Sequence, residues 1–169
     1  MRQKLSSTQC AALREELQRA RERLAYLYAM ERYPEVVTEA DRYRATIHFC
    51  DEFAERDEDR VDVDTIATVV ILQTRAATAL SVGREDWVYA LYQVDEGLRT
   101  LLAIFADRLP IRAYDRAKQV RALERLRRDL LDQLFPGPRA QMRTALHDAV
   151  REERYEDAAR LRDRLRRRR

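Results

Sequence analysis

A chain of 169 residues with three glycines, four prolines and 37% charged residues has the length and composition of one helical domain with a small appendage. No apolar run approaches the roughly 20 residues that cross a bilayer, and the N-terminus lacks a signal peptide's apolar core, so we expect a cytoplasmic, bacterial-type protein without a membrane segment. The net charge of +3 is uneven, because residues 139–169 hold 11 arginines and 6 acids, whereas residues 1–138 hold 22 basic and 24 acidic groups.

The first two predicted helices share one apolar spacing. The first begins near Ser7 or Thr8, either of which can cap it, and runs to about Glu31. Pro34 suits the first turn of the second. Their inward positions, at three- and four-residue steps, are Leu13, Leu17, Leu24, Leu27, Tyr28, Val36, Val37, Ala40, Tyr43, Ile47, Cys50 and Phe53. Residues 55–64, which follow, are acidic and lack an apolar stripe, so they are predicted to form an exposed loop.

The third predicted helix has the most apolar middle in the chain. Asp64 is expected to cap it, Leu80 to end it and Gly83 to supply the stop. Residues 67–72 are nearly all apolar, which predicts the most deeply buried helix of the set.

Two further helices complete a predicted five-helix bundle. The fourth runs from about residue 85 to 108, before Pro110, and the fifth from about 112 to 134. Their expected inward residues are Trp87, Ala90, Leu91, Val94, Leu98, Leu101, Leu102, Phe105, Tyr114, Ala117, Val120, Leu123, Leu130, Leu131 and Leu134.

The clearest break in the chain is Phe135-Pro136-Gly137-Pro138, because two prolines around a glycine cannot continue a helix. We place a domain boundary there, between a bundle of residues 1–135 and a two-helix hairpin of residues 136–169. Each hairpin helix has one apolar stripe, formed by Met142, Leu146, Ala149 and Val150 and by Ala158, Ala159, Leu161 and Leu165. The turn at 151–155 lacks glycine and proline, so we expect it to be tight, with Tyr155 filling its apex and Ala158 and Ala159 allowing close approach.

The hairpin resembles the UVR motif of the excision-repair proteins UvrB and UvrC. The most specific part of the resemblance is Tyr155-Glu156, Ala158-Ala159 and Leu161-Arg162-Asp163, and the whole is confined to residues 141–166. The motif recurs in some Clp-type ATPases and in activators of bacterial protein arginine kinases. Those activators carry paired-cysteine zinc modules that this chain lacks, so the resemblance does not extend to their role. In the family the hairpin is a non-catalytic docking module that pairs with another copy of itself.

The expected fold is therefore all-α, and the arrangement of the first five helices has two alternatives. Tyr33, Trp87 and Tyr155 are each predicted to lie at the apex of a turn, and each precedes a small or β-branched residue three positions later. This pattern is consistent with a short tetratricopeptide-like array of hairpins, but the aromatic residues have no fixed period. A plain antiparallel bundle with similar tight turns is the other alternative.

Catalytic and metal chemistry find little support in the sequence. Cys10 and Cys50 are too few and too far apart for a disulfide framework or a zinc site. His48 and Cys50 are two residues apart, so on a helix they point in different directions. The acidic run from Asp57 has no central glycine, and Thr68 stands where an EF-hand loop needs glutamate. Without a phosphate loop or nucleophile motif either, we expect no enzyme, no metal site and no cofactor.

We therefore expect an adaptor that binds another protein, or a second copy of itself, through the hairpin. The second hairpin belongs to another copy of this protein, to an excision-repair protein, to a Clp-type ATPase or to this chain's own bundle, and the resemblance implies the excision-repair and Clp-type alternatives. The expected contact and turn residues are Met142, Leu146, Val150, Tyr155, Ala158, Leu161, Arg162, Asp163 and Leu165. Arg162 is expected to pair with a carboxylate such as Glu153 or Asp163 of the partner hairpin.

Two alternative functions remain open. One is a nucleic-acid accessory in which the terminal arginines, Arg166, Arg167, Arg168 and Arg169, contact phosphates, although no aromatic residues interleave with them to stack on bases. A solvated tail that offsets the negative end of the last helix explains the same arginines. The other is a structural homodimer.

Overall fold

The computed structural model describes residues 4–110 and 112–167, and it confirms the all-α fold class. The elements are α1 (Ser7–Ala29), α2 (Tyr33–Phe53), η1 (Asp57–Asp59), α3 (Val63–Val82), α4 (Trp87–Arg108), α5 (Arg112–Arg116), α6 (Lys118–Leu134), α7 (Pro138–Arg151) and α8 (Tyr155–Arg167). The chain forms two compact units, residues 1–127 and 128–169, which meet within α6. The sequence instead places the boundary at residue 135, and the break between α6 and α7 is indeed found there.

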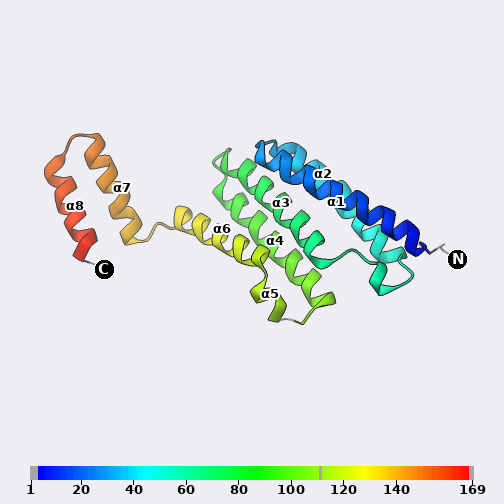
Figure 1. Ribbon diagram of the computed structural model, residues 1–169. Helices are drawn as coiled ribbons and strands as arrows, with labels where there is room; N and C mark the ends of the chain where they lie inside the picture. Colours follow the sequence, from blue (N-terminus) through cyan, green and yellow to red (C-terminus); the bar gives the residue numbers. More distant parts are fainter. Residues whose placement is uncertain (1–3, 111, 168–169) are drawn as a thin grey trace. The chain divides into compact units, whose positions relative to one another are not determined.

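Helices α1 to α4 form the core of the first unit (Figure 1). Helix α3 lies between α4 on one side and the pair α1 and α2 on the other. Most predicted inward residues of α1 and α2 are confirmed as buried: Leu17, Leu24, Leu27, Val36, Ala40, Ile47 and Cys50. Ser6, rather than Ser7 or Thr8, caps α1 through a capping box with Gln9. Leu102, expected to face inward on α4, is 42% exposed instead.

Helix α3 is the central helix of this unit and has nine buried residues. It contacts α1, α2 and α4, which explains why its apolar residues are not confined to one stripe. Asp62 caps α3, not Asp64, because the Asp62 carboxylate accepts the N–H of Thr65 at 2.8 Å. Contrary to our expectation, this helix is long and apolar enough to cross a membrane by length and composition. Half of its apolar window is buried inside the protein, as in the core helix of a globular unit.

Three hairpin turns share one backbone geometry. Among the described residues, the non-glycine residues with a left-handed backbone are Glu31, Glu85 and Glu153, at φ 57°, 60° and 58°. In each turn the glutamate N–H donates to the carbonyl three residues back, and the next N–H donates to the carbonyl five residues back. This is a Schellman motif with glutamate at the position where glycine is usual. Gly83 ends α3 as predicted but has a right-handed backbone, and Glu85 makes the reversal.

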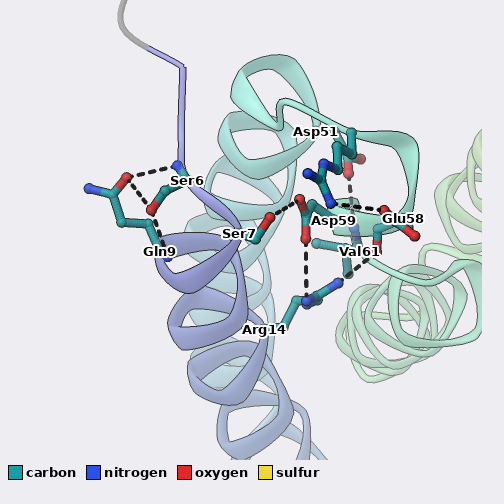
Figure 2. A network of polar contacts seen from close by, with 9 residues as sticks. Ser6, Ser7, Gln9, Arg14, Asp51, Glu58, Asp59 and Val61 are labelled. Carbon is teal, nitrogen blue, oxygen red and sulfur yellow. Dashed lines mark hydrogen bonds and ion pairs between the residues drawn. The ribbon is translucent and has the colours of Figure 1, made fainter.

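The acidic segment after α2 is mostly exposed, as we predicted, but it is held in place at two buried residues. Val61 is 2% exposed and Asp59 is 5% exposed, within a stretch that includes the 3-10 helix η1. The Asp59 carboxylate accepts the Ser7 hydroxyl at 2.7 Å and lies 3.8 Å from the Arg14 guanidinium (Figure 2). The sequence did not indicate these two positions, because they are buried singly and not as part of an apolar stripe.

The same segment is fixed at its other end by Asp51 and Arg108. The Asp51 carboxylate accepts the N–H of Val61 at 3.1 Å and forms an ion pair with Arg108, which also donates to the Val61 carbonyl at 2.5 Å. The segment therefore joins α2 to α4 through polar contacts.

The predicted fifth helix is two helices, because the α-helical backbone is interrupted at Ala117. The Ala117 N–H donates to the carbonyl of Tyr114, three residues back, rather than to the residue four back. After this break, Gln119 donates to Asp64 at 2.6 Å and Arg127 donates to Asp95 at 2.7 Å, joining the first part of α6 to α3 and α4. Val120, Leu123 and Leu130 of α6 are buried as predicted.

Candidate functional site: the C-terminal hairpin

The candidate site is the antiparallel hairpin of α7 and α8 in the second unit (Figure 1). Gly137 precedes α7, and Pro138 occupies its first turn, where a missing N–H has no cost. Helix α8 begins at Tyr155, with Glu156 and Asp157 in its first turn, where carboxylates oppose the positive end of the helix dipole. The predicted helix–turn–helix organisation is therefore present, and the segment is not one continuous helix.

Two alanines are the buried residues of the hairpin among those described. Ala149 of α7 is 0% exposed and Ala158 of α8 is 7% exposed. Small side chains at buried positions allow two helices to approach closely. We predicted that Ala158 and Ala159 would have this role, but Ala159 is only half-buried. The two buried alanines instead come one from each helix.

The apolar residues predicted to make the docking contact are only partly covered. Val150 is 52% exposed, whereas Met142, Leu146, Leu161 and Leu165 are half-buried. We predicted that Tyr155 would fill the apex of the turn, but its side chain is 68% exposed and does not do so. The Schellman geometry closes the turn through backbone hydrogen bonds, so no side chain is needed at the apex. The hairpin thus presents Val150 and Tyr155 to solvent.

A polar groove of about 490 Å³ occupies another part of the hairpin surface. Its lining is mostly charged and excludes Val150 and Tyr155; it comprises Ala145, Asp148, Glu152, Arg154, Asp157, Arg160, Leu161 and Arg164. Leu161, predicted as a docking residue, therefore borders this groove. The hairpin consequently has two distinct surfaces: exposed apolar residues and a charged groove.

Arg154 forms ion pairs with one residue of the turn and one residue of α8. Its guanidinium lies 2.8 Å from Glu152 and 3.1 Å from Asp157. The hydrogen bonds that Arg154 donates to these two carboxylates, first to Glu152 and then to Asp157, raise the pKa of Arg154 above its usual value. Arg162, predicted to pair with a partner's carboxylate, pairs within its own helix with Asp163 at 3.2 Å, and both side chains are more than half exposed.

The arginines at the end of the chain are only partly described. Arg166 is exposed and α8 ends at Arg167, but Arg168 and Arg169 lie outside the described residues. The predicted phosphate contacts of these four arginines therefore stay a prediction.

The other candidates from the sequence do not assemble into a chemical site. His48 and His147 are exposed, and Cys10 and Cys50 are buried free thiols. Burial, followed by the nearby Cys10 and Asp51, raises the pKa of Cys50 to about 11, so this thiol is protonated at neutral pH. Within residues 4–110 and 112–167, no group of three or more histidines, cysteines and acids is placed to hold a metal ion.

Sequence reasoning missed the residues that set the shape of the turn. Glu153 has a left-handed backbone, Arg154 forms ion pairs with Glu152 and Asp157, and Ala149 is the buried residue of α7 among those described. A signal for the turn existed, because Glu31-Arg32-Tyr33 and Glu153-Arg154-Tyr155 are the same string. The aromatic residue of this string does not set the turn, because the glutamate makes the reversal.

Comparison with known proteins identifies one similarity, and it covers the hairpin. The family model described as the UvrB/uvrC motif matches residues 139–167, which span α7 and α8. No curated protein and no solved structure matches the chain. The C-terminal hairpin, and not the whole chain, therefore carries the similarity to the UvrB/uvrC motif.

Proposed function

We propose that this protein is an adaptor that docks through its C-terminal hairpin onto a UvrB/uvrC-type hairpin of another protein. The observation that carries the proposal is the exposure of Val150 and Tyr155 within the segment that matches the motif. Large apolar side chains exposed on a small hairpin gain free energy when a partner covers them. The half-burial of Met142, Leu146 and Leu165 supports a continuous apolar contact around Val150.

The proposed contact has an apolar centre and a polar edge. Val150 lies at the centre, and the Arg162–Asp163 pair, whose side chains are more than half exposed and can exchange with other charges, lies on α8. Interfaces of this kind obtain most of their binding energy from a few central apolar or aromatic residues, while the edge excludes water and selects the partner. Val150 and Tyr155 are therefore the residues on which the affinity should depend.

The first unit would then be the part that the hairpin connects to its partner. We assign no chemical step to the first unit. UvrB, UvrC and a Clp-type ATPase are the partner candidates, because the resemblance of the hairpin extends to motifs of those proteins.

The test is a binding measurement with the full-length protein and purified UvrB, UvrC or Clp-type ATPase of the same organism. Replacing Val150→Asp should weaken binding by about 100-fold, because the carboxylate must be desolvated at the contact. This position is 52% exposed, so the hairpin should remain helical by circular dichroism. Leu161 is a poorer choice, since it is half-buried within the hairpin itself.

Val88→Asp is the matched control, because Val88 is 69% exposed on α4 in the first unit. It should leave binding unchanged. Absence of binding to all three proteins, or equal loss in both variants, would contradict docking through the hairpin.

A further inference from the structure

The charged groove of the hairpin contains two arginines whose charge is not neutralised. Its three acids are already engaged: Asp148 pairs with Arg151, and Glu152 and Asp157 both pair with Arg154. Arg160 and Arg164, which line the same groove, have no ion pair among the described residues. They are four residues apart on α8, so they lie on the same side of the helix.

Unpaired guanidinium groups in this arrangement fit a partner that is rich in carboxylates. Two arginines at this spacing can each donate a bidentate pair of hydrogen bonds to a carboxylate. A nucleic-acid backbone fits less well, since the three acids of the same groove would face its phosphates. The favoured occupant is therefore an acidic protein segment, which can place its charges beside the arginines and away from the acids.

The chain itself contains such a segment. Residues 51–64 hold eight acids and two arginines, a net charge of −6, whereas residues 139–169 carry a net +5. Some of these acids are used internally, as Asp51, Asp59 and Asp62 are. Others have exposed side chains: Asp57 is 94% and Glu58 is 75% exposed, although each lies 3.4 Å from a neighbouring arginine, Arg60 and Arg56 respectively. Exposed ion pairs of this kind contribute little free energy, so these carboxylates can exchange partners. Glu55 is exposed and has no ion pair among the described residues.

We propose that the groove arginines of one copy bind the acidic segment of a second copy, and that the exchange is reciprocal. Each copy carries both surfaces, so two copies related by a two-fold axis make the same contact twice and close. The second contact is intramolecular once the first has formed, which raises the affinity above that of a single charged contact. The occupant of the groove is thus Glu55, Asp57 and Glu58 of a second copy.

The first test is the mass of the full-length protein as a function of salt, by light scattering at micromolar concentration. Exposed charges attract over about 30 Å at 0.01 M salt but only about 3 Å at 1 M. The mass should therefore be twice 20.0 kDa at low salt and 20.0 kDa at high salt. A monomeric mass at every salt concentration, as an intramolecular contact would give, overturns the proposal.

The second test exchanges the charges. Arg160→Glu with Arg164→Glu, and separately Glu55→Lys with Asp57→Lys and Glu58→Lys, should each give a monomer at low salt. Mixing the two variants should restore the dimer, because both contacts become complementary again. The matched control is Arg84→Glu with Arg125→Glu, which changes net charge equally at two exposed arginines without ion pairs among the described residues. This control should stay dimeric.

The inference stands apart from the proposed docking function, and one variant separates them. Val150→Asp should leave the salt-dependent dimer intact, since Val150 does not line the groove. If Val150→Asp abolishes the dimer while the charge reversals do not, the dimer uses the apolar surface and the charged contact is wrong.

Discussion

Of the three glycines, Gly97 of α4 has the least room for a side chain, because it lies against Thr74 of α3. A Cβ atom at this position would lie 2.4 Å from Thr74 Oγ1 and 2.7 Å from Thr74 Cγ2. Both residues are buried. Helix glycine normally weakens a helix, so its presence here is explained by the close approach of the two backbones. One missing methyl group thus sets the distance between the central helix and its neighbour.

We predict that Gly97→Ala lowers the free energy of unfolding by about 1–3 kcal/mol, since the added methyl overpacks a contact that cannot easily relax. Thr74→Ala in the same chain should recover most of the loss, because the two substitutions act on one contact. Urea denaturation of the single and double variants measures both effects. Gly137→Ala is the control: no atom lies within 4 Å of its Cβ position, so stability should change little.

At the scale of elements, the turn with a left-handed glutamate explains why three helical hairpins close without glycine. A left-handed backbone costs a non-glycine residue roughly 1–2 kcal/mol. In compensation, the paired backbone hydrogen bonds of each turn satisfy carbonyls that would otherwise lack partners at the helix end. The turn geometry is therefore kept by the backbone, and glutamate is tolerated rather than preferred.

We predict that Glu153→Gly stabilises the hairpin by about 1 kcal/mol, because glycine adopts φ 58° without strain. Hydrogen exchange of the α7 and α8 amides measures this locally, since exchange reports the free energy of opening. Glu156→Gly, an exposed position of right-handed backbone in α8, should instead destabilise the hairpin by about 1 kcal/mol. Equal effects of the two substitutions would show that the turn strain is not released.

Helix positions were predictable where periodicity and breaks agree. The apolar steps from Leu17 to Cys50 gave the buried faces of α1 and α2, and Pro136 with Pro138 marked the end of α6. The buried positions of the acidic segment were not predictable in this way, because Val61 and Asp59 are buried singly, by contacts with residues distant in the sequence. The break at Ala117 also left no signal, since alanine favours a helix and only its hydrogen bonding differs.

The candidate site was predictable as a motif but not as a geometry. Tyr155-Glu156 and Leu161-Arg162-Asp163 indicated a hairpin of the UVR type, and the family comparison places the motif at residues 139–167. The spacing could not tell that Ala149 would be buried as well as Ala158, or that Arg154 would take Glu152 and Asp157 as partners. Those outcomes depend on how one helix faces the other, which a single stripe does not specify.

At the scale of the whole molecule, the chain consists of two compact units, and the segment between α6 and α7 is open. Phe135 is 72% exposed, and no atom lies within 4 Å of a Cβ built on Gly137. Exposed segments with few contacts are where domains separate and where changes are tolerated. The hairpin should therefore be removable without loss of the bundle.

We predict that a chain ending at Phe135 unfolds cooperatively, with a midpoint within about 2 °C of the bundle transition in the full chain, because all of α6 is retained. Thermal unfolding followed by circular dichroism at 222 nm measures this. The comparison is a chain ending at Arg127, which lacks the buried Leu130 and should unfold at a lower temperature. A large loss already in the longer chain would place the boundary elsewhere.

The turn geometry that the three hairpins share has a consequence for protein engineering. The backbone conformation of residues 30–33, 84–87 and 152–155 recurs with different neighbours. These four-residue turns should therefore be able to replace one another. A designer could transplant the turn of one hairpin into another. This would vary the charged and aromatic side chains at the turn while the backbone conformation stays the same.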